Sequence, residues 1–196
     1  MGAPHPQAPW VPILLRSAIA AAYGGMTIFW QEPTLSVLAL AGGLYFVLTG
    51  LSIWRMSALA RSCGTPQVPG ALLASAVVYA AAGIAVAFAQ STLVFAYVGG
   101  AALLVGGLIE FAFWFRVRKD FTPARDWLIT GAAAIGAAAL MPAFLALAES
   151  SHVRALFGVS GGSAVIIAVV LAISGLGLRH DASLAPESSE ASKAVN

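Results

Sequence analysis

One ionisable residue stands out because it lies inside an apolar stretch of the chain: Glu110. It precedes Phe115 by five residues, about 7–8 Å from the end of that stretch at helical rise. A buried carboxylate is costly in a bilayer, so such a residue is a functional candidate by default. Arg16 lies at a similar depth in another apolar stretch, and Arg125 is a further possible partner. The sequence favours a structural ion pair at Glu110, with a proton-linked or ligand-binding role as the alternative.

A second candidate is the motif Gly158-Val159-Ser160-Gly161, which imitates the Gly-x-Ser-Gly of intramembrane serine proteases. A serine nucleophile needs a histidine base within about 3 Å. His180 follows Ser160 by twenty residues, about 30 Å away by helical rise, and His152 precedes it in a turn. No later helix supplies a base. We therefore expect no catalytic residue in this chain, and hence no enzyme.

The histidines and the cysteine do not suggest a metal site. His5, His152 and His180 fall in the N-terminal segment, a turn and a helix exit, so no two share a helix face. Cys63 is the only cysteine, so an intrachain disulfide is excluded. We expect no metal and no cofactor. Glu149 and His152 share a turn that can sense external pH, since histidine titrates near neutral pH, although a solvated loop histidine is the simpler interpretation.

The composition places these residues in a membrane. The chain has 196 residues, of which 60% are hydrophobic and 9% charged, and its mean hydropathy is +0.89. Soluble domains are roughly 45–50% apolar and about 25% charged. So few charges cannot cover the surface of a soluble enzyme of this size. The net charge of +2 is spread over short loops, so we expect no nucleic-acid partner.

Six stretches are long and apolar enough to cross a bilayer core of about 30 Å as helices. They are residues 13–30, 34–54, 71–89, 92–115, 127–148 and 153–178. Short turns force antiparallel neighbours, so the sequence predicts an all-α integral membrane protein of three helical hairpins. The predicted hairpins are 13–54, 71–115 and 127–178. Residues 1–12 are expected to be a short N-terminal segment and residues 179–196 a disordered tail, with one transmembrane domain over 13–178.

Lysine and arginine predict the orientation of the spans. Of the ten basic residues, only Arg154 lies on the side of the three short turns. The positive-inside rule therefore places both termini in the cytoplasm. All five tryptophans lie at predicted span ends, where an amphipathic ring prefers to sit. These boundary residues are Trp10, Trp30, Trp54, Trp114 and Trp127.

The second and fourth spans share a glycine pattern. Both read Gly-Gly, six residues, Gly-Leu, at a constant offset of 57 (99 − 42 and 107 − 50). The sixth span carries a third, diverged copy. All copies begin on the same side of the membrane. They are therefore parallel repeats, which can form a pseudo-threefold bundle. Small residues allow close helix packing in lipid, so these glycines are predicted to pack helices. They are Gly42, Gly43, Gly50, Gly99, Gly100, Gly107, Gly161 and Gly162.

The hairpins, the tight turns, the Gly-Gly pairs and the Gly-Leu-Ile-Glu run before a basic exit resemble the HdeD family of small bacterial membrane proteins. The likeness is carried by Gly25–Trp54 and Gly83–Lys119. The best-matching residues are Pro33, Gly42, Gly43, Gly50, Gly99, Gly100, Gly107 and Glu110. The resemblance implies a six-helix protein of the bacterial plasma membrane, linked to acid tolerance, with no enzymatic activity and no catalytic residues.

These observations predict a non-enzymatic membrane protein of the acid-stress type. It would act by association with the lipid bilayer or with proteins, as a homo-oligomer or in a larger membrane complex. One alternative is a small transporter or proton-linked channel that uses Glu110. Another is an accessory subunit that docks sideways on other helices. A water-filled path to Glu110 would favour transport, whereas a dry, closed bundle would favour association.

Overall fold

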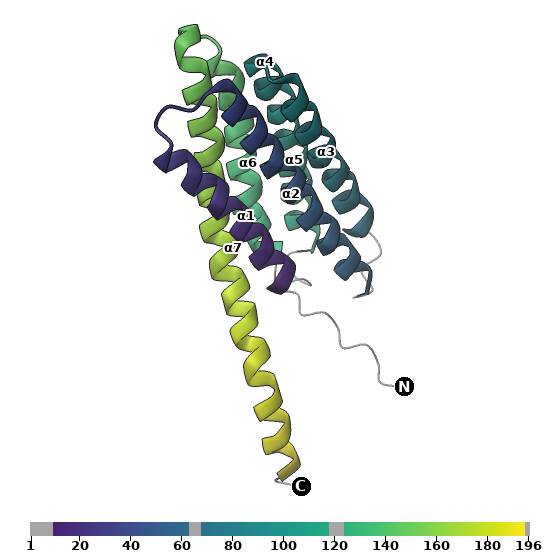
Figure 1. Ribbon diagram of the computed structural model, residues 1–196. Coiled ribbons are helices and arrows are strands. Elements are labelled where there is room, and N and C mark those ends of the chain that lie inside the picture. Colours follow the sequence, from purple (N-terminus) through teal and green to yellow (C-terminus); the bar gives the residue numbers. More distant parts are fainter. Residues whose placement is uncertain (1–9, 63–67, 118–123, 195–196) are drawn as a thin grey trace.

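The computed structural model describes residues 10–62, 68–117 and 124–194, and these parts of the chain are helical without a strand (Figure 1). The elements are α1 (Trp10–Phe29), α2 (Leu35–Ser62), α3 (Val68–Ala89), α4 (Thr92–Val94), the π-helix η1 (Phe95–Gly99), α5 (Gly100–Val117), α6 (Ala124–Phe144) and α7 (Glu149–Ala194). The short α4 and η1 continue into α5 and form one span with it. Six helices are long and apolar enough to cross a membrane. The prediction of an all-helical chain with six membrane-length spans is confirmed.

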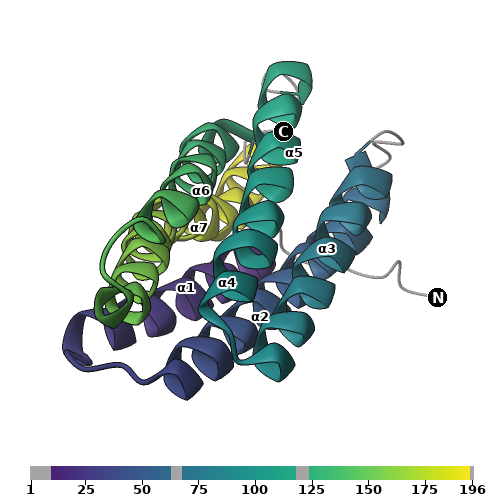
Figure 2. The same cartoon turned by 90° about the horizontal axis from the view of Figure 1, so that it is seen from above.

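The spans follow one another round the bundle in chain order, and α7 closes the ring against α1 (Figure 2). Extensive and sparse interfaces alternate round this ring. The extensive ones join α2 to α3, α5 to α6 and α7 to α1, whereas α1 and α2, which a short turn connects, contact each other less. The closest packing therefore lies between the predicted hairpins rather than within them. A short turn makes two helices neighbours, but small side chains decide which neighbours approach closely.

Each of the three extensive interfaces has two crossing points, seven residues apart on both helices, where small residues let the backbones approach. The first crossing points are Gly43 with Gly83, Gly161 with Gly24 and Gly100 with Ala138. The second crossing points are Gly50 with Ala76, Gly107 with Gly131 and Ala168 with Ser17. The same pair of contacts thus recurs three times, as three parallel repeats about a pseudo-threefold axis would give. Ala168 fills the place that glycine takes in the first two copies.

The glycines predicted to pack helices, except Gly162, lie against a neighbouring helix by different contacts. A Cβ atom at Gly43 would lie 2.7 Å from the carbonyl oxygen of Gly83, and one at Gly107 would lie 2.8 Å from that of Gly131. Gly42 and Gly99 instead face aromatic rings, and Gly161 faces Thr27 and Gly24. Gly162 differs from the others, because nothing lies within 4 Å of a Cβ atom there.

The second spans of the first two repeats also begin alike. Thr34 accepts a hydrogen bond on its hydroxyl from the amide of Val37 (3.3 Å), and Ser91 accepts one from the amide of Val94 (3.5 Å). These caps satisfy amides that the first helical turn leaves unpaired. They stand 57 residues apart (91 − 34), the offset of the glycine pattern. Gln90, at φ 44°, makes the tight turn before the second cap.

Two helix ends differ from the predictions. The chain over 179–196 was expected to be disordered, but α7 continues as a helix to Ala194 and projects beyond the bundle (Figure 1). Alanine and glutamate in this stretch favour a helix, whereas the serines and Pro186 do not, so the extension follows from the helix already nucleated in the bundle. The fifth span was expected to reach residue 148, but α6, which contains Pro142, ends at Phe144. Proline disrupts the helical ladder, and i→i+3 bonds such as Leu145 N–H to Pro142 O (3.1 Å) follow it.

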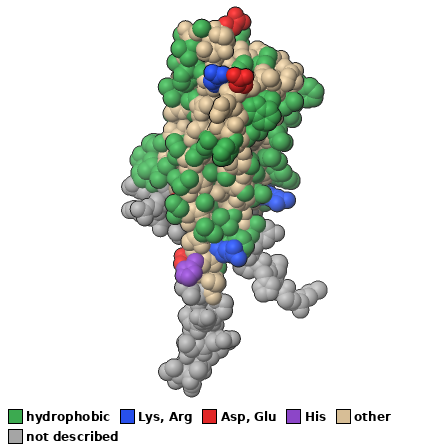
Figure 3. All heavy atoms as spheres, turned by 60° about the vertical axis from the view of Figure 1, so that its left-hand side comes forward, with side chains coloured by type: hydrophobic (Ala, Val, Ile, Leu, Met, Phe, Trp, Pro, Cys, Tyr) green, Lys and Arg blue, Asp and Glu red, His purple; other side chains and the backbone are tan. Residues whose placement is uncertain are grey.

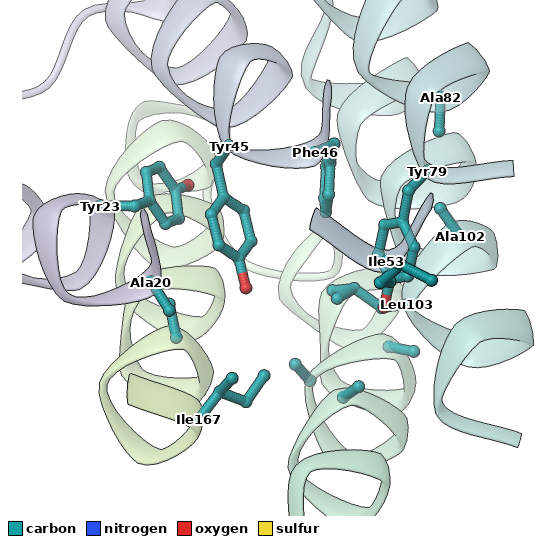
Figure 4. Packing of buried hydrophobic residues seen from close by; sticks show 14 of the residues in the cluster. Ala20, Tyr23, Tyr45, Phe46, Ile53, Tyr79, Ala82, Ala102, Leu103 and Ile167 are labelled. Carbon is teal, nitrogen blue, oxygen red and sulfur yellow. The ribbon is translucent and has the colours of Figure 1, made fainter. Parts of the chain in front are cut away.

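The core at the middle of the bundle is partly aromatic. Tyr23, Tyr45, Phe46 and Tyr79 form a row from α1 across α2 to α3, with successive ring centroids 4.5, 5.6 and 6.1 Å apart (Figure 4). Trp127 lies at the end of the candidate span Asp126–Phe144, as predicted, and its ring is buried in this core cluster. Its ring packs on Phe113 from the neighbouring α5, which removes it from the lipid-facing surface.

Candidate functional site

The centre of the bundle holds the ion pair that the sequence suggested. The Nη2 atom of Arg16 on α1 lies 2.5 Å from the Oε1 atom of Glu110 on α5, and their side chains are 10% and 3% exposed. These two spans are not neighbours in the ring. Only long side chains can meet across the axis, and the arginine stem provides that reach. The side chain of Arg125, the other suggested partner, lies outside the described residues.

Thr130 completes the site from a third repeat. Its hydroxyl donates a hydrogen bond to the Oε2 atom of Glu110 (2.5 Å) and is fully buried on α6. The two carboxylate oxygens of Glu110 therefore face two different spans. We call Arg16, Glu110 and Thr130 the axial triad, because the first, second and third repeats each contribute one member.

Thr130 was not predicted from the sequence, although the repeats contain a signal for it. Arg16, Ser75 and Thr130 each stand one residue before the second crossing point of their helix, at offsets of 59 (75 − 16) and 55 (130 − 75). Glu110 has its own counterparts, Ile53 and Leu171, at offsets of 57 (110 − 53) and 61 (171 − 110). One set of equivalent axial positions is thus polar in all three repeats, and the other is polar only in the second.

Tyrosines and glycine surround the axial triad. Tyr45 and Tyr79 belong to the buried aromatic row that crosses the middle of the bundle. A Cβ atom at Gly106, one turn before Glu110, would lie 2.6 Å from the Tyr79 hydroxyl oxygen. Glycine at this position therefore makes room for the phenol to reach the axis.

The energetics of the axial triad explain its role in the fold. Taking a carboxylate and a guanidinium out of water costs several kcal/mol per ion, and their mutual attraction offsets this only when both are present. Removing one partner of such a pair typically destabilises a protein by about 3–5 kcal/mol. The charges therefore hold three repeats in one arrangement. In this state Glu110 is engaged by Arg16 and Thr130 and is buried away from solvent.

Ser160 is placed for structure rather than for nucleophilic attack. Its Oγ atom lies 2.7 Å from the Tyr23 hydroxyl and donates to the Leu156 carbonyl oxygen at 2.8 Å. His152 instead has its Nε2 atom 3.0 Å from the carbonyl oxygen of Leu147 in the preceding turn. Ser160 therefore links α7 to α1 through Tyr23.

The suggested pH-sensing turn lies at the start of α7. Glu149 is exposed and His152 half-buried, and the ring of His152 contacts the Leu147 carbonyl rather than Glu149. Within residues 10–62, 68–117 and 124–194, no three histidine, cysteine, aspartate or glutamate side chains gather as metal ligands. Cys63 and His5 lie outside the described residues.

The surface carries charges toward the two ends of the bundle and a hydrophobic band between them (Figure 3). Two apolar hollows open on this band, one of 390 Å³ between α1 and α2 and one of 350 Å³ between α2 and α3. A third, of 460 Å³, lies under the first turn, where Arg154 is 3.9 Å from Glu32. Arg16 and Glu110 line none of these three hollows.

Comparison with protein-family models, with curated proteins and with solved structures gave no match to this chain. Its function is therefore inferred from the geometry of its own residues.

Proposed function

We propose that this chain is a non-enzymatic protein of the bacterial plasma membrane, of the acid-stress type that its glycine pattern resembles. It works as a closed helical bundle that associates with the lipid bilayer, with partner proteins or with copies of itself. The observation that carries the proposal is the engagement of Glu110 by Arg16 and Thr130. The one acidic residue deep inside a span serves to join three repeats, so it is occupied in holding the bundle closed.

In this proposal the three hairpins cross the membrane with both termini in the cytoplasm. Nine of the ten basic residues then lie on the cytoplasmic side, as the positive-inside rule requires. The start of α1 and the projecting part of α7 lie toward the same end of the bundle, which supports this orientation (Figure 1).

Association is supported by the shape of the lipid-facing surface. The hollow between α1 and α2 is lined by apolar and aromatic side chains, including Ile19, Met26, Leu44 and Leu48. Such a surface has nothing to gain from water and fits acyl chains or the helices of another protein. This feature also suits the accessory-subunit alternative, in which the bundle docks on a larger membrane complex.

The transporter alternative makes a different demand on Glu110. A proton-linked channel needs the carboxylate to exchange its proton with water on both sides of the membrane. Glu110 would then have to leave Arg16 and Thr130 during each cycle. This would leave the buried charge of Arg16 without a counter-ion. The closed arrangement of the axial triad favours association over transport.

A pair of measurements tests the proposal. The purified protein is reconstituted in liposomes with an internal pH-sensitive dye, and a pH step is applied. We expect the same proton leak as in empty liposomes. In parallel, cells that lack the protein are challenged with acid and complemented with the native chain or with Glu110→Gln. We expect the native chain to raise survival, and the variant to match it per folded molecule.

The outcomes separate the functions. Proton flux that Glu110→Gln abolishes would establish the transporter and refute the closed scaffold. Equal acid survival with and without the chain would remove the acid-stress role. Native mass measurement in mild detergent then distinguishes a homo-oligomer from a subunit of a larger complex.

A further inference from the structure

Four buried polar atoms of the bundle have no hydrogen-bond partner among the described residues. They are Nε of Arg16, Oγ1 of Thr49, Oγ of Ser75 and Oε1 of Glu110, of which the last makes its ion-pair contact with Arg16. All four residues are at least nine-tenths buried. Leaving a buried polar group unpaired costs about 1–3 kcal/mol, so buried polar groups in native proteins nearly always have partners. The contact with Arg16 compensates Glu110 Oε1, so the three atoms that call for an explanation are Arg16 Nε, Thr49 Oγ1 and Ser75 Oγ.

The four atoms belong to residues that face the same region. Arg16 and Glu110 form one pair, and the Tyr79 hydroxyl lies against Gly106, one helical turn before Glu110 on α5. Thr49 is one helical turn from Tyr45 on α2, and Ser75 is one turn from Tyr79 on α3. Residues four apart share a helix face, so both hydroxyls face the axis beside their tyrosines.

The chemistry of the four groups selects the ligand. Arg16 Nε–H can only donate and ionised Glu110 Oε1 can only accept, while the two hydroxyls can do either. A cation would be repelled by Arg16 and an anion by Glu110. The ligand must therefore be neutral and both donate and accept hydrogen bonds.

The packing limits its size. Gly50 and Ala76 follow Thr49 and Ser75 by one residue, and a Cβ atom at Gly50 would lie 2.6 Å from the Ala76 carbonyl oxygen. The helices are therefore in backbone contact beside the two hydroxyls, and only a very small molecule fits between them. Water meets both conditions.

We infer that the bundle binds internal water on its axis, held by Arg16, Glu110, Thr49 and Ser75. A buried water makes about three hydrogen bonds, so about one or two molecules would satisfy the three atoms. This water connects the first and second repeats, as Thr130 connects the second and third. The inference does not depend on the acid-stress role, because it concerns the folded bundle alone.

Radiolytic footprinting tests the inference. Protein in lipid nanodiscs is exposed to an X-ray beam, which produces hydroxyl radicals from bound water, and modified residues are identified by mass spectrometry. Tyr45 and Tyr79 are expected to be modified several-fold faster than Phe95, a buried ring in the apolar core. Modification of the tyrosines at the rate of Phe95 would overturn the inference.

Variants of the two hydroxyls sharpen the test. Thr49→Val and Ser75→Ala together are expected to lower the modification of Tyr45 and Tyr79 toward the rate of Phe95. The matched control is Ser52→Ala, because the Ser52 hydroxyl is also buried but donates to the Thr49 carbonyl oxygen at 2.7 Å. This control should leave the tyrosines unchanged. If the double variant keeps the native modification rate, the two hydroxyls do not hold water.

Thermal stability gives an independent readout. Thr49→Val keeps the shape of the side chain and removes its hydroxyl. If that hydroxyl had no hydrogen-bond partner, the substitution would remove an unsatisfied buried polar group and raise the Tm. With water bound at the hydroxyl, the substitution should lower the Tm, and Thr49→Ser should restore it. A Tm above that of the native protein for Thr49→Val would contradict bound water.

Discussion

At the three extensive helix interfaces, backbones touch where glycine, alanine or serine stands at a crossing point, and the same two contacts recur each time. On the axis, in contrast, Arg16 and Thr130 meet at Glu110, and this contact occurs once among the described residues. The interfaces follow the symmetry of the repeats, and the axial triad breaks it. Ile53 and Leu171 stand where a symmetric bundle would repeat Glu110.

The difference shows how a repeat can be closed into one specific arrangement. Packing of small residues is similar at all three interfaces, so it cannot by itself distinguish one repeat from another. A charge that finds its partner only across the axis fixes which helices face each other. Buried polar groups have this specifying role in some proteins, at a cost in stability. Loss of one charge on the axis should therefore exceed the loss at any one crossing point.

The largest effect is expected from removing one charge. Glu110→Ala leaves Arg16 buried without its counter-ion, and we expect a loss of about 3–5 kcal/mol in the free energy of unfolding. The measurement is the fraction of protein that stays monodisperse in detergent after a heating series.

The matched control removes both charges together. Glu110→Leu, which copies Leu171 of the third repeat, is combined with Arg16→Met, which keeps the length of the side chain. Replacing a buried ion pair by apolar residues of similar volume is often neutral, so this double variant should be more stable than Glu110→Ala. A double variant that is less stable than the single one would show that the axial charges do more than satisfy each other.

These axial residues also show what the sequence could predict. Glu110 and Arg16 were identifiable because charges are rare inside apolar spans. Thr130 was not, because a threonine in a membrane helix can bond to its own backbone and so carries no signal of a remote partner. Ser75 and Thr49 are hidden for the same reason. Only the alignment of the repeats, through the crossing points, shows that Ser75 and Thr130 occupy equivalent positions.

The second largest effect is expected at Thr130. Thr130→Val keeps the shape of the side chain but removes the hydrogen bond to Glu110. Hydrogen bonds to charged groups contribute about 1.5–3 kcal/mol, so we expect a loss in that range by the same heating series. The comparison variant is Thr27→Val, since the Thr27 hydroxyl bonds locally to the Gly24 carbonyl oxygen at 2.8 Å. An equal loss in both variants would remove Thr130 from the axial triad.

A comparable or smaller effect is expected at one crossing point. Gly43→Ala places a Cβ atom 2.7 Å from the carbonyl oxygen of Gly83, so α2 and α3 must separate. Overpacking of this kind costs about 1–3 kcal/mol. Gly136→Ala is the control, because nothing lies within 4 Å of a Cβ atom there, and alanine favours the helix by up to about 1 kcal/mol. If the two variants had equal stability, backbone contact at Gly43 would not stabilise the bundle.

The interfaces, too, were only partly predictable. The spans followed from length and hydropathy, and the paired glycines of α2 and α5 followed from their repetition. Among their partners, Gly83 and Gly131 are single glycines, and the doublet Gly24-Gly25 has no counterpart at those two positions, so no pattern singled them out. The contact between α1 and α7 joins the two ends of the chain, and connector length carries no information about it.

The smallest effect is expected where α1 meets α7 through Tyr23. Tyr23→Phe removes the hydroxyl that lies 2.7 Å from Ser160 Oγ but keeps the ring, which stacks on Tyr45 at 4.5 Å. Ser160 retains its bond to the Leu156 carbonyl oxygen, so only one neutral hydrogen bond is lost, worth about 0.5–1.5 kcal/mol. Tyr23→Leu also removes the stacked ring and should cost more. A loss in Tyr23→Phe as large as that in Glu110→Ala would mean that the α1–α7 interface, and not the axis, specifies how the ring of helices closes.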